Sequence, residues 1–342
     1  MSASVETKST DGLIEVADLR LWYPVRRGFL ASLLGLGEDR HLKAVDGVSF
    51  AIKQGEVLGL AGESGCGKST TGMTVMRLLK PTAGTISFGG TDVASFQSSA
   101  ELKSFRRNVQ IVFQNPYEAL NPRFTVYESV REPVAVHFPG DRDLQHEKIV
   151  RALERAGLTP PETYFDRYPH QLSGGQLQRI AIARAIAIEP KLLVADEPVS
   201  MLDVSIRAGI LNLFRSFSRD LGMSILYISH DLSTMRHVCQ RVAIMYLGKI
   251  VEIGTADEVL VSPRHPYTQA LVAAVPLMGG AARERVQLEG AVPNPIDLPA
   301  GCRFHPRCSK AFAPCSTTEP RVVQEPEGRR TMCHLVDPER TG

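Results

Sequence analysis

The chain has 342 residues, and its 39 Lys and Arg against 37 Asp and Glu give a formal charge of +2 at pH 7. This near balance excludes the global charge asymmetry typical of nucleic-acid-binding proteins, so any charged site has to be local. The length indicates about two domains, at roughly 150 residues each.

Residues 1–12 are polar and lack the apolar core and cleavage pattern of a secretory signal, and no apolar run is long enough to span a bilayer. Work at a membrane would therefore need another subunit to cross it. The six cysteines are expected in a reducing compartment, where clustered cysteines more often hold metal than form disulfides.

Hydrophobic periodicity predicts the elements in chain order. We expect strands over residues 14–21, 44–53, 57–61, 86–88, 109–113, 192–195, 223–229 and two around the turn at 248–249, and helices over 70–80, 146–156, 177–188 and 267–275. Residues 26–41 read as a surface insertion with a short amphipathic helix over 29–34, whose function the sequence does not reveal.

The first motif, Gly62 to Thr70, follows an apolar run and fits the pattern G-x-x-x-x-G-K-[ST]. In such a turn the backbone N–H groups close around phosphates, and the following helix adds its partial positive charge. We expect Lys68 to reach the β- and γ-phosphates and the Ser69 hydroxyl to bind Mg²⁺. A turn that merely joined a strand to a helix would need neither side chain.

A second glycine motif, Leu172 to Gln176, reads Leu-Ser-Gly-Gly-Gln and precedes the helix at 177–188. Serine and two glycines at a helix start form an anion-binding N-terminus. An ordinary N-cap is the alternative, but two consecutive glycines weaken a helix and so favour a close backbone approach to a ligand.

Polar side chains follow three of the expected strands. Gln114 follows the strand at 109–113, Asp196 and Glu197 follow the strand at 192–195, and His230 ends the strand at 223–229. Ligands of α/β sheets bind at this edge. Because successive strand residues point to opposite sides, one carboxylate can serve a metal and the other a water. Solvated turn carboxylates and a structural histidine are the alternatives.

The C-terminal part is rich in Pro and Gly over 290–306 and contains the spacing Cys302-x5-Cys308-x6-Cys315-x17-Cys333. Four thiolates without a large local core indicate a metal or cluster site that substitutes for hydrophobic burial. Zinc and a four-iron cluster both accept four cysteines, and the tight C-x2-C pairing of most zinc ribbons is missing. Four unligated cysteines remain the alternative.

With these motifs in this order, the chain resembles the nucleotide-binding subunits of ABC transporters over residues 14–256. Three further stretches, 115–122, 265–268 and 301–308, are similar to the oligopeptide/dipeptide importer branch. The insertion after Val25 is similar to that of its F-type ATPase subunit.

The resemblance implies an α/β fold with a P-loop NTPase core of the ABC ATPase type, an antiparallel β subdomain and an inserted helical subdomain. We expect the ATPase domain over 1–260, the helical subdomain over about 115–175, and a small Cys-rich extension over 261–342.

The resemblance also implies individual roles. Tyr23 would stack on adenine, Glu197 would be the general base, and His230 would contact the γ-phosphate. The implied catalytic residues are Glu197, His230, Gln114 and Lys68. The implied nucleotide-binding residues are Tyr23, Gly62, Ser64, Gly65, Cys66, Gly67, Lys68, Ser69, Thr70, Ser173, Gly174, Gly175, Gln176 and Asp203. Ser173 and Gly175 would complete the site of the other protomer, so that hydrolysis requires a dimer.

Two metal sets and the partners follow from the same resemblance. The sets are Ser69, Gln114 and Asp196 for Mg²⁺, and Cys302, Cys308, Cys315 and Cys333 for a four-iron, four-sulfur cluster, with Zn²⁺ as the alternative. The implied partners are a second ATPase subunit, in a heterodimer with a D-type paralogue, two membrane-spanning permease subunits and an extracytoplasmic solute-binding protein, with no nucleic acid. The ATPase would lie peripherally on the cytoplasmic face of the inner membrane.

Peptides are the expected cargo, and oligosaccharide, nickel or another solute are alternatives, as is a soluble ABC ATPase without a transport role. In the loop Ser200 to Asp203 the family more often has alanine where this chain has Met201. Similar variants occur in members assigned to oligosaccharide uptake, which leaves the cargo open.

Overall fold

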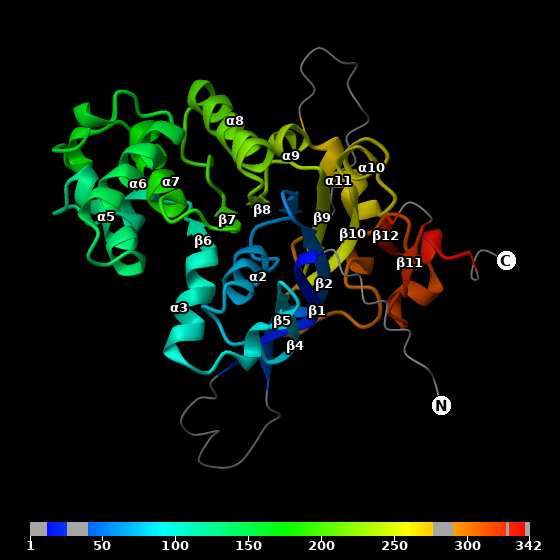
Figure 1. Ribbon diagram of the computed structural model, residues 1–342. Coiled ribbons are helices and arrows are strands. Elements are labelled where there is room, and N and C mark those ends of the chain that lie inside the picture. The colour runs from blue at the N-terminus through cyan, green and yellow to red at the C-terminus, as the bar shows by residue number, and fades with distance from the viewer. Residues whose placement is uncertain (1–11, 26–39, 276–289, 326–327, 339–342) are drawn as a thin grey trace, which may run out of the picture.

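The computed structural model describes residues 12–25, 40–275, 290–325 and 328–338 (Figure 1). The strands are β1 (Gly12–Pro24), β2 (His41–Lys53), β3 (Val57–Ala61), β4 (Ala83–Phe88), β5 (Thr91–Asp92), β6 (Val109–Val112), β7 (Leu192–Asp196), β8 (Ser224–Ser229), β9 (Arg241–Tyr246), β10 (Lys249–Thr255), β11 (Val322–Gln324) and β12 (Arg330–Met332). The α-helices are α2 (Lys68–Val75), α3 (Ser99–Asn108), α4 (Pro116–Ala119), α5 (Val126–His137), α6 (Arg142–Arg155), α7 (Gly174–Ile186), α8 (Val204–Leu221), α9 (Leu232–Val238), α10 (Ala256–Val261) and α11 (Pro266–Ala273). The helix expected over 29–34 lies outside the described residues.

These strands form two sheets. An antiparallel sheet has the order β2-β1-β4-β5, and the core sheet has the order β11-β12-β10-β9-β3-β8-β7-β6. Within the core sheet β9, β3, β8, β7 and β6 run parallel, whereas β10, β12 and β11 are antiparallel to their neighbours. The expected antiparallel sheet beside a mainly parallel core is confirmed.

The core sheet is buried on both faces. Along β7, Leu192 and Val194 pack with the antiparallel sheet and α2, while Leu193 and Ala195 pack with the side chains of α8 and α9. Strands covered on both faces become continuous apolar runs, which explains why this segment shows no alternation in the sequence. Helix α2 lies between the two sheets, and a Cβ on its Gly72 would stand only 2.8 Å from Ile228 Cδ1.

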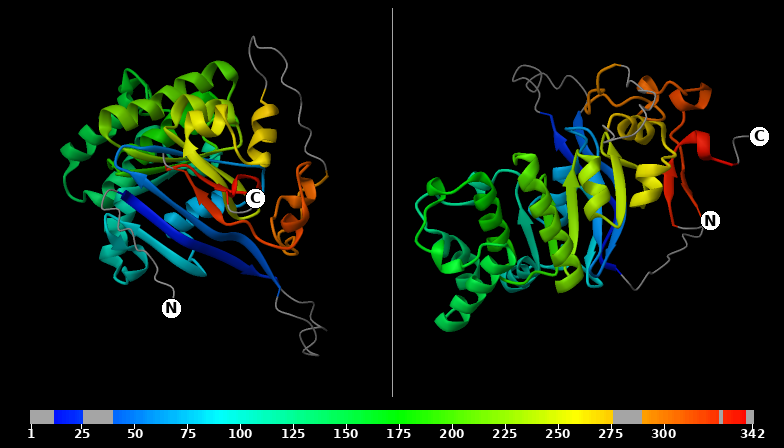
Figure 2. Two further views of the ribbon diagram at one scale, coloured as in Figure 1. Left: turned by 90° about the vertical axis from the view of Figure 1, so that its right-hand side faces the viewer. Right: turned by 90° about the horizontal axis from the view of Figure 1, so that it is seen from above.

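The helices between β6 and β7 form one end of the molecule. Helices α5, α6 and α7 pack together there, at the opposite end from β11 and β12 (Figure 2). Thr125 caps α5 in a capping box with Glu128, so two backbone donors at the helix start are satisfied by side chains. An inserted helical region was expected here, and its stated limits of 115–175 stay a prediction.

Helix α2 is shorter than the sequence predicts. The expected helix ran to Lys80, but the described one ends at Val75 and Arg77 adopts a left-handed backbone with φ of 54°. The Arg77 guanidinium donates to the carbonyls of Val93 and Phe96 at 2.5 and 2.6 Å. This contact with a distant loop accompanies a turn where local propensity favours helix.

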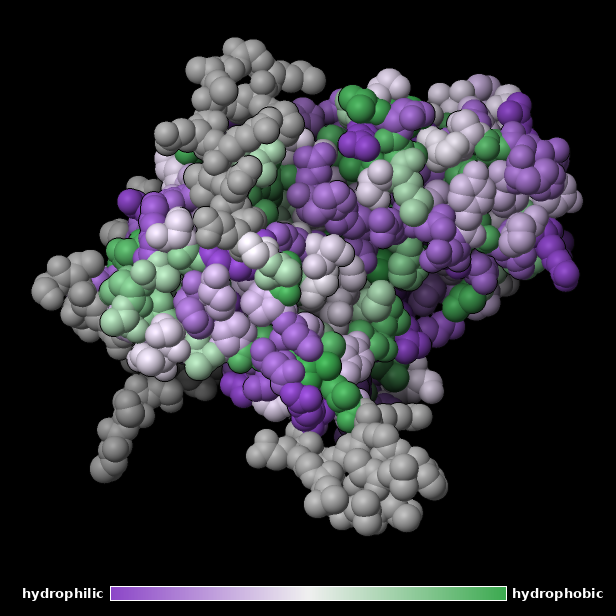
Figure 3. Space-filling model, turned by 180° about the vertical axis from the view of Figure 1, so that it is seen from behind, coloured by the Kyte–Doolittle hydropathy of each residue, from purple (hydrophilic) through white to green (hydrophobic). Residues whose placement is uncertain are grey.

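The C-terminal strands extend the core sheet. Strand β12 pairs with β10, where Glu252 lies opposite Thr331. Hydrogen bonds between β10 and β12 thus join the parts of the chain before and after residue 260. The domain boundary expected near this residue stays a prediction. Seen from behind, the molecular surface is mostly hydrophilic, with apolar side chains in small groups (Figure 3). Within the described ranges, no helix has the length and apolar character needed to cross a bilayer.

Candidate active site

A cavity of about 820 Å³ lies over the phosphate loop at the carboxyl ends of the core strands. It is lined by Tyr23, Leu42, Lys43, Ala44, Gly62, Glu63, Ser64, Gly65, Gly67, Lys68, Ser69, Thr70, Gln114, Glu197, His230, Leu247, Gly248, Leu271 and Pro295. Most of the predicted nucleotide and catalytic residues therefore share one cavity. The predicted residues Cys66, Ser173, Gly174, Gly175, Gln176, Asp196 and Asp203 are not among its lining residues.

Two glycines shape the phosphate loop. Gly62 and Gly67 have φ of 149° and 105°, conformations that side-chain-bearing residues rarely adopt. A Cβ would lie 2.2 Å from the Met245 carbonyl oxygen at Gly62, and 2.1 Å from the Ala44 carbonyl oxygen at Gly67. The loop passes so close to neighbouring backbone that only glycine fits at these two positions.

Lys68 and Ser69 begin α2 at the bottom of the cavity. The buried Lys68 ammonium donates to the carbonyls of Gly62 and Glu63 at 2.8 and 3.0 Å, so it lies against the loop that it follows. The Ser69 hydroxyl donates to Asp196 Oδ1 at 3.0 Å. Burial raises the pKa of Asp196, while this hydrogen bond opposes the rise. Serine and carboxylate oxygens suit Mg²⁺, so both side chains fit the predicted metal role.

Glu197 points its carboxylate at His230. Its Oε1 lies 2.8 Å from His230 Nδ1 and accepts the backbone N–H of the same residue at 3.0 Å. The two adjacent carboxylates do separate, but not for the expected reason. Strand β7 ends at Asp196, and Glu197 has a left-handed backbone with φ of 49°, so a turn rather than strand alternation directs it into the cavity.

The aromatic side of the cavity is Tyr23, near the end of β1. It pairs with Leu42 on β2 and has 39% of its surface exposed. An aromatic ring that is open to the cavity can stack on a purine. The adenine contact expected of Tyr23 stays a prediction.

The Leu-Ser-Gly-Gly-Gln motif lies elsewhere on the surface, at the start of α7. Ser173 caps this helix in a capping box with Gln176. A Cβ on Gly175 would lie 2.8 Å from Ile206 Cγ2 on α8, whereas one on Gly174 would meet open space. Close helix packing therefore accounts for Gly175, and only Gly174 retains the expected opening toward a ligand.

The loop before α8 is exposed beside this motif. Met201 in this loop and Val204 at the first position of α8 expose 62% and 75% of their surface, and Asp203 is exposed as well. Asp203 occupies the N-cap position of α8 without a side-chain capping bond. Ser173 and Gly174 of the motif, together with Met201 and Asp203, are therefore accessible to another chain.

The four C-terminal cysteines converge on one small pocket, which all of them line. Burial raises the pKa of the Cys302, Cys308 and Cys333 thiols. Within the described ranges, however, no three or more His, Cys, Asp or Glu side chains are arranged to hold a metal ion. The four cysteines share a pocket, but the geometry gives the predicted zinc ion or cluster no support.

Several lining residues were not expected from the sequence. Leu271 and Pro295 come from the C-terminal part of the chain, and Glu63 occupies a variable position of the phosphate-loop pattern. No periodicity or motif marks Leu271 or Pro295 as site residues. The stretch 265–268, which forms the N-cap and first turn of α11, was noted only as a family resemblance.

Comparison with known proteins agrees with this arrangement. The sequence profile described as ABC transporter matches residues 45–200, and the one described as oligopeptide/dipeptide transporter, C-terminal region, matches residues 251–315. The oligopeptide transport ATP-binding protein AppF of Bacillus subtilis is 44% identical over 326 residues, which cover 94% of this chain and 97% of that protein. The dipeptide transport ATP-binding protein DppF of Escherichia coli is 43% identical over 326 residues, or 95% of each chain.

Solved structures share the fold. The cbiO1 protein of Clostridium perfringens, described as part of an ABC transporter complex, superimposes with a TM-score of 0.62 at 30% identity, over 74% of this chain and 92% of that chain. The ATP-binding cassette MJ0796, in a dimeric post-hydrolysis state bound to ADP and Pi, gives 0.61 at 26% identity, over 71% of this chain and 98% of that chain.

Proposed function

The chain belongs to the ATP-binding proteins of oligopeptide and dipeptide ABC transporters, and we propose that it hydrolyses ATP between two chains to drive the import of a peptide. One observation carries this proposal. The phosphate loop, Gln114, Glu197 and His230 come from four separate segments and line a single cavity, which Tyr23 lines as well.

In this proposal ATP lies with its adenine on Tyr23 and its phosphates in the loop from Gly62 to Thr70. The backbone N–H groups and the Lys68 ammonium bind the phosphate oxygens through charge-assisted hydrogen bonds. Ser69, Asp196 and Gln114 would hold Mg²⁺, which when bound supplies positive charge that neutralises the phosphates. Cys66 contributes its backbone only, because its side chain is buried in the core between the two sheets.

Glu197 would act as the general base. Its carboxylate faces the cavity and would orient a water and accept its proton as the γ-phosphate is displaced. His230, hydrogen-bonded to that carboxylate, would fix its direction and contact the γ-phosphate. The role of base suits Glu197, because in the described hydrogen bonds Lys68 and Ser69 donate to other groups and leave its carboxylate to the water.

The second half of each site would come from another chain. Ser173, Gly174, Gly175 and Gln176 lie outside the cavity at the start of α7, where Ser173 and Gly174 are exposed, and Asp203 lies exposed at the start of α8. In the related cassette a dimer is bound to ADP and Pi. Closing two chains on two ATP molecules would add contacts that are lost when the γ-phosphate leaves.

Transport follows if this closure moves membrane partners. Gln114 leads into α4, where Tyr117 exposes 61% of its surface. This segment would transmit closure to two permease subunits, supplied by an extracytoplasmic binding protein, at the cytoplasmic face of the inner membrane. A D-type paralogue is the proposed second ATPase. Oligosaccharide or nickel remain alternative cargoes, and a soluble ATPase without transport is the alternative class.

A four-iron, four-sulfur cluster at the four C-terminal cysteines stays a prediction, with zinc as its alternative. Metal analysis of anaerobically purified protein tests it directly. About four iron atoms and four acid-labile sulfides per chain would support the cluster, whereas one zinc per chain would replace it. Metal-free protein with full ATPase activity would contradict both.

The proposed function is tested by reconstitution. The chain is purified with its co-expressed partners, placed in liposomes with the binding protein, and supplied with ATP and labelled peptides or oligosaccharides. We expect ATP-dependent peptide uptake that disappears in the Glu197→Gln variant. ATP hydrolysis without uptake of any solute would favour the soluble ATPase.

A further inference from the structure

The phosphate loop is held in place from the C-terminal part of the chain. The Glu63 carboxylate accepts two hydrogen bonds from the Arg307 guanidinium, at 2.7 and 3.1 Å. The Arg307 side chain is only 6% exposed, and that of Glu63 26%. Two parallel contacts of this kind fix the direction of a carboxylate as well as its charge.

The backbone of Glu63 is held by the same region. Its N–H donates to the Tyr267 hydroxyl at 2.9 Å, and its carbonyl accepts from Lys68 at 3.0 Å. Tyr267 is fully buried, with its ring 5.3 Å from that of Phe304. The side chain, N–H and carbonyl of Glu63 thus all form hydrogen bonds, and the carbonyl accepts its bond from the phosphate-binding Lys68.

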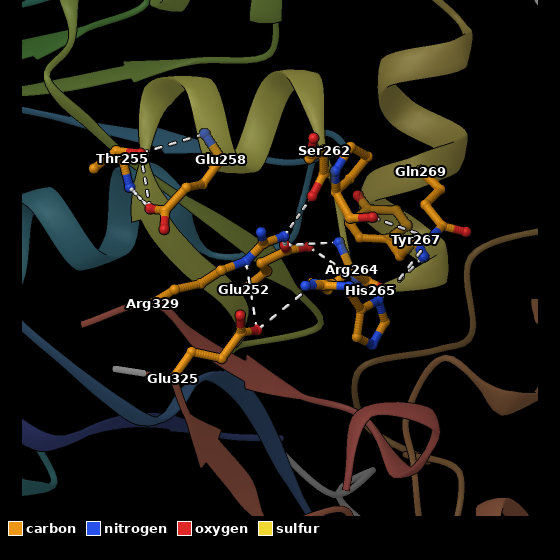
Figure 4. A network of polar contacts seen from close by, with 11 residues as sticks. Glu252, Thr255, Glu258, Ser262, Arg264, His265, Tyr267, Gln269, Glu325 and Arg329 are labelled. Carbon is orange, nitrogen blue, oxygen red and sulfur yellow. Dashed lines mark hydrogen bonds and ion pairs between the residues drawn. The ribbon is translucent and has the colours of Figure 1, made fainter. Parts of the chain in front are cut away.

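Tyr267 is itself anchored by the network in Figure 4. Glu252, fully buried on β10, forms an ion pair with Arg329 and accepts the backbone N–H of His265 at 3.0 Å. His265 Nδ1 in turn accepts the Tyr267 N–H at 3.1 Å. The network therefore connects Arg329, just before β12, to helix α11, whose Tyr267 hydroxyl accepts the Glu63 N–H.

A second arginine makes a matching contact outside the lining of the cavity. Arg303 forms an ion pair with Asp46 on β2, in which both side chains are 11% exposed. Asp46 Oδ1 accepts the Trp22 indole N–H at 3.0 Å, next to Tyr23. Burial acts to raise the pKa of Asp46, but the hydrogen bond and charge of Arg303 hold it below its ordinary value. Both arginines belong to the turn between Cys302 and Cys308.

The ion pair with Arg307 explains how the negative charge of Glu63 can lie near bound phosphates. Glu63 lines the cavity that holds the phosphate loop, and a carboxylate there would repel the phosphates of ATP. Its half-buried ion pair with Arg307 offsets this repulsion and keeps the loop backbone in one conformation. An acidic residue in a phosphate loop is acceptable because another segment supplies its partner.

We propose that Arg307 is a positioning residue of the nucleotide site, through which the turn 302–308 sets the affinity for the triphosphate. The inference rests on the proposed ATP binding and adds a residue from outside the ATPase motifs. Arg307 is not among the residues that line the cavity, so it acts through Glu63.

The test is equilibrium binding of a fluorescent ATP analogue with Mg²⁺, together with kcat and KM for ATP and a melting curve for each variant. Arg307→Met should weaken binding by about tenfold or more and raise KM, with kcat within about twofold of the wild-type value. Arg307→Lys should fall between the two. Glu63→Gln in the Arg307→Met background should restore most of the affinity, because the unpaired charge is gone.

Arg321→Met is the matched control, since Arg321 pairs with Asp337 in the same region away from the cavity, and its affinity should equal that of the wild type. Arg307→Lys, which keeps the charge but loses the paired hydrogen-bond geometry, decides the matter if Arg307→Met does not fold. Wild-type affinity in Arg307→Met, or a loss that Glu63→Gln does not relieve, would overturn the inference. Wild-type protein that binds no ATP analogue would instead contradict the proposed function.

Discussion

The carboxylate of Glu197 lies 2.8 Å from the Nδ1 of His230 and accepts the backbone N–H of the same residue. The two residues directly follow neighbouring strands of the core sheet, β7 and β8, and meet beyond their carboxyl ends. The Glu197 side chain is 13% exposed and that of His230 62%. A shielded base beside an accessible partner suits a site where water must be oriented and the phosphate must be sensed.

Lys68→Ala should weaken ATP binding by roughly 10- to 100-fold, because a hydrogen bond to a charged group contributes about 1.5–3 kcal/mol. The affinity is measured by titration with ATP and Mg²⁺. Lys80→Ala, at an exposed position five residues past the end of α2, is the control and should bind normally. Undiminished affinity in Lys68→Ala would rule out the phosphate-loop assignment.

Two alanine substitutions separate packing from function at the start of α7. Gly175→Ala places a Cβ 2.8 Å from Ile206 and should lower stability by about 1–3 kcal/mol. Gly174→Ala meets open space and should leave the melting temperature unchanged or higher, yet lower ATP turnover at least ~10-fold if a partner's nucleotide lies there. Melting curves and steady-state hydrolysis distinguish the two. Full activity of the Gly174→Ala variant would instead show that the motif is an ordinary helix cap.

Acid should destabilise the protein through His265. Burial lowers the pKa of this residue to about 3, while in the unfolded chain it is about 6.5. The unfolded state therefore binds one more proton between these values, so stability falls as pH decreases through that window, by up to about 1.4 kcal/mol per pH unit. His265→Asn keeps the helix cap and should flatten this slope.

Urea unfolding between pH 7 and pH 5 measures the slope. His170→Asn, at an exposed position, serves as the control and should keep the wild-type dependence. The same slope in His265→Asn as in the wild type would show that His265 is not buried in its neutral form.

Sequence patterns predicted the core strands well where functional residues lie at the ends of those strands. The strands before Gly62, Gln114, Asp196 and His230 are where apolar runs indicated, because such strands are buried on both faces. The phosphate loop was predicted because its glycines and lysine stand at fixed spacing. In contrast, the segment 204–221 was left unassigned, although it forms α8 against the sheet.

The remaining features depend on contacts between distant segments. Strands β11 and β12 have three residues each, too short for a periodic signal, and exist because β10 offers an edge to pair with. The left-handed conformation of Glu197 is likewise set by its surroundings. Arg307 and Glu63 are 244 positions apart, so no local pattern could relate them.

The central claim is that Glu197 performs hydrolysis within a two-chain ATP site. It is tested most directly by Glu197→Gln, with ATP turnover and the mass of the ATP-bound particle measured alongside the wild type and in the presence of the partner ATPase. The account predicts turnover reduced by roughly 10²- to 10⁴-fold, unchanged ATP affinity and a stable particle with two ATP-binding chains. Wild-type turnover in this variant, or an ATP-bound particle with a single such chain, would contradict it.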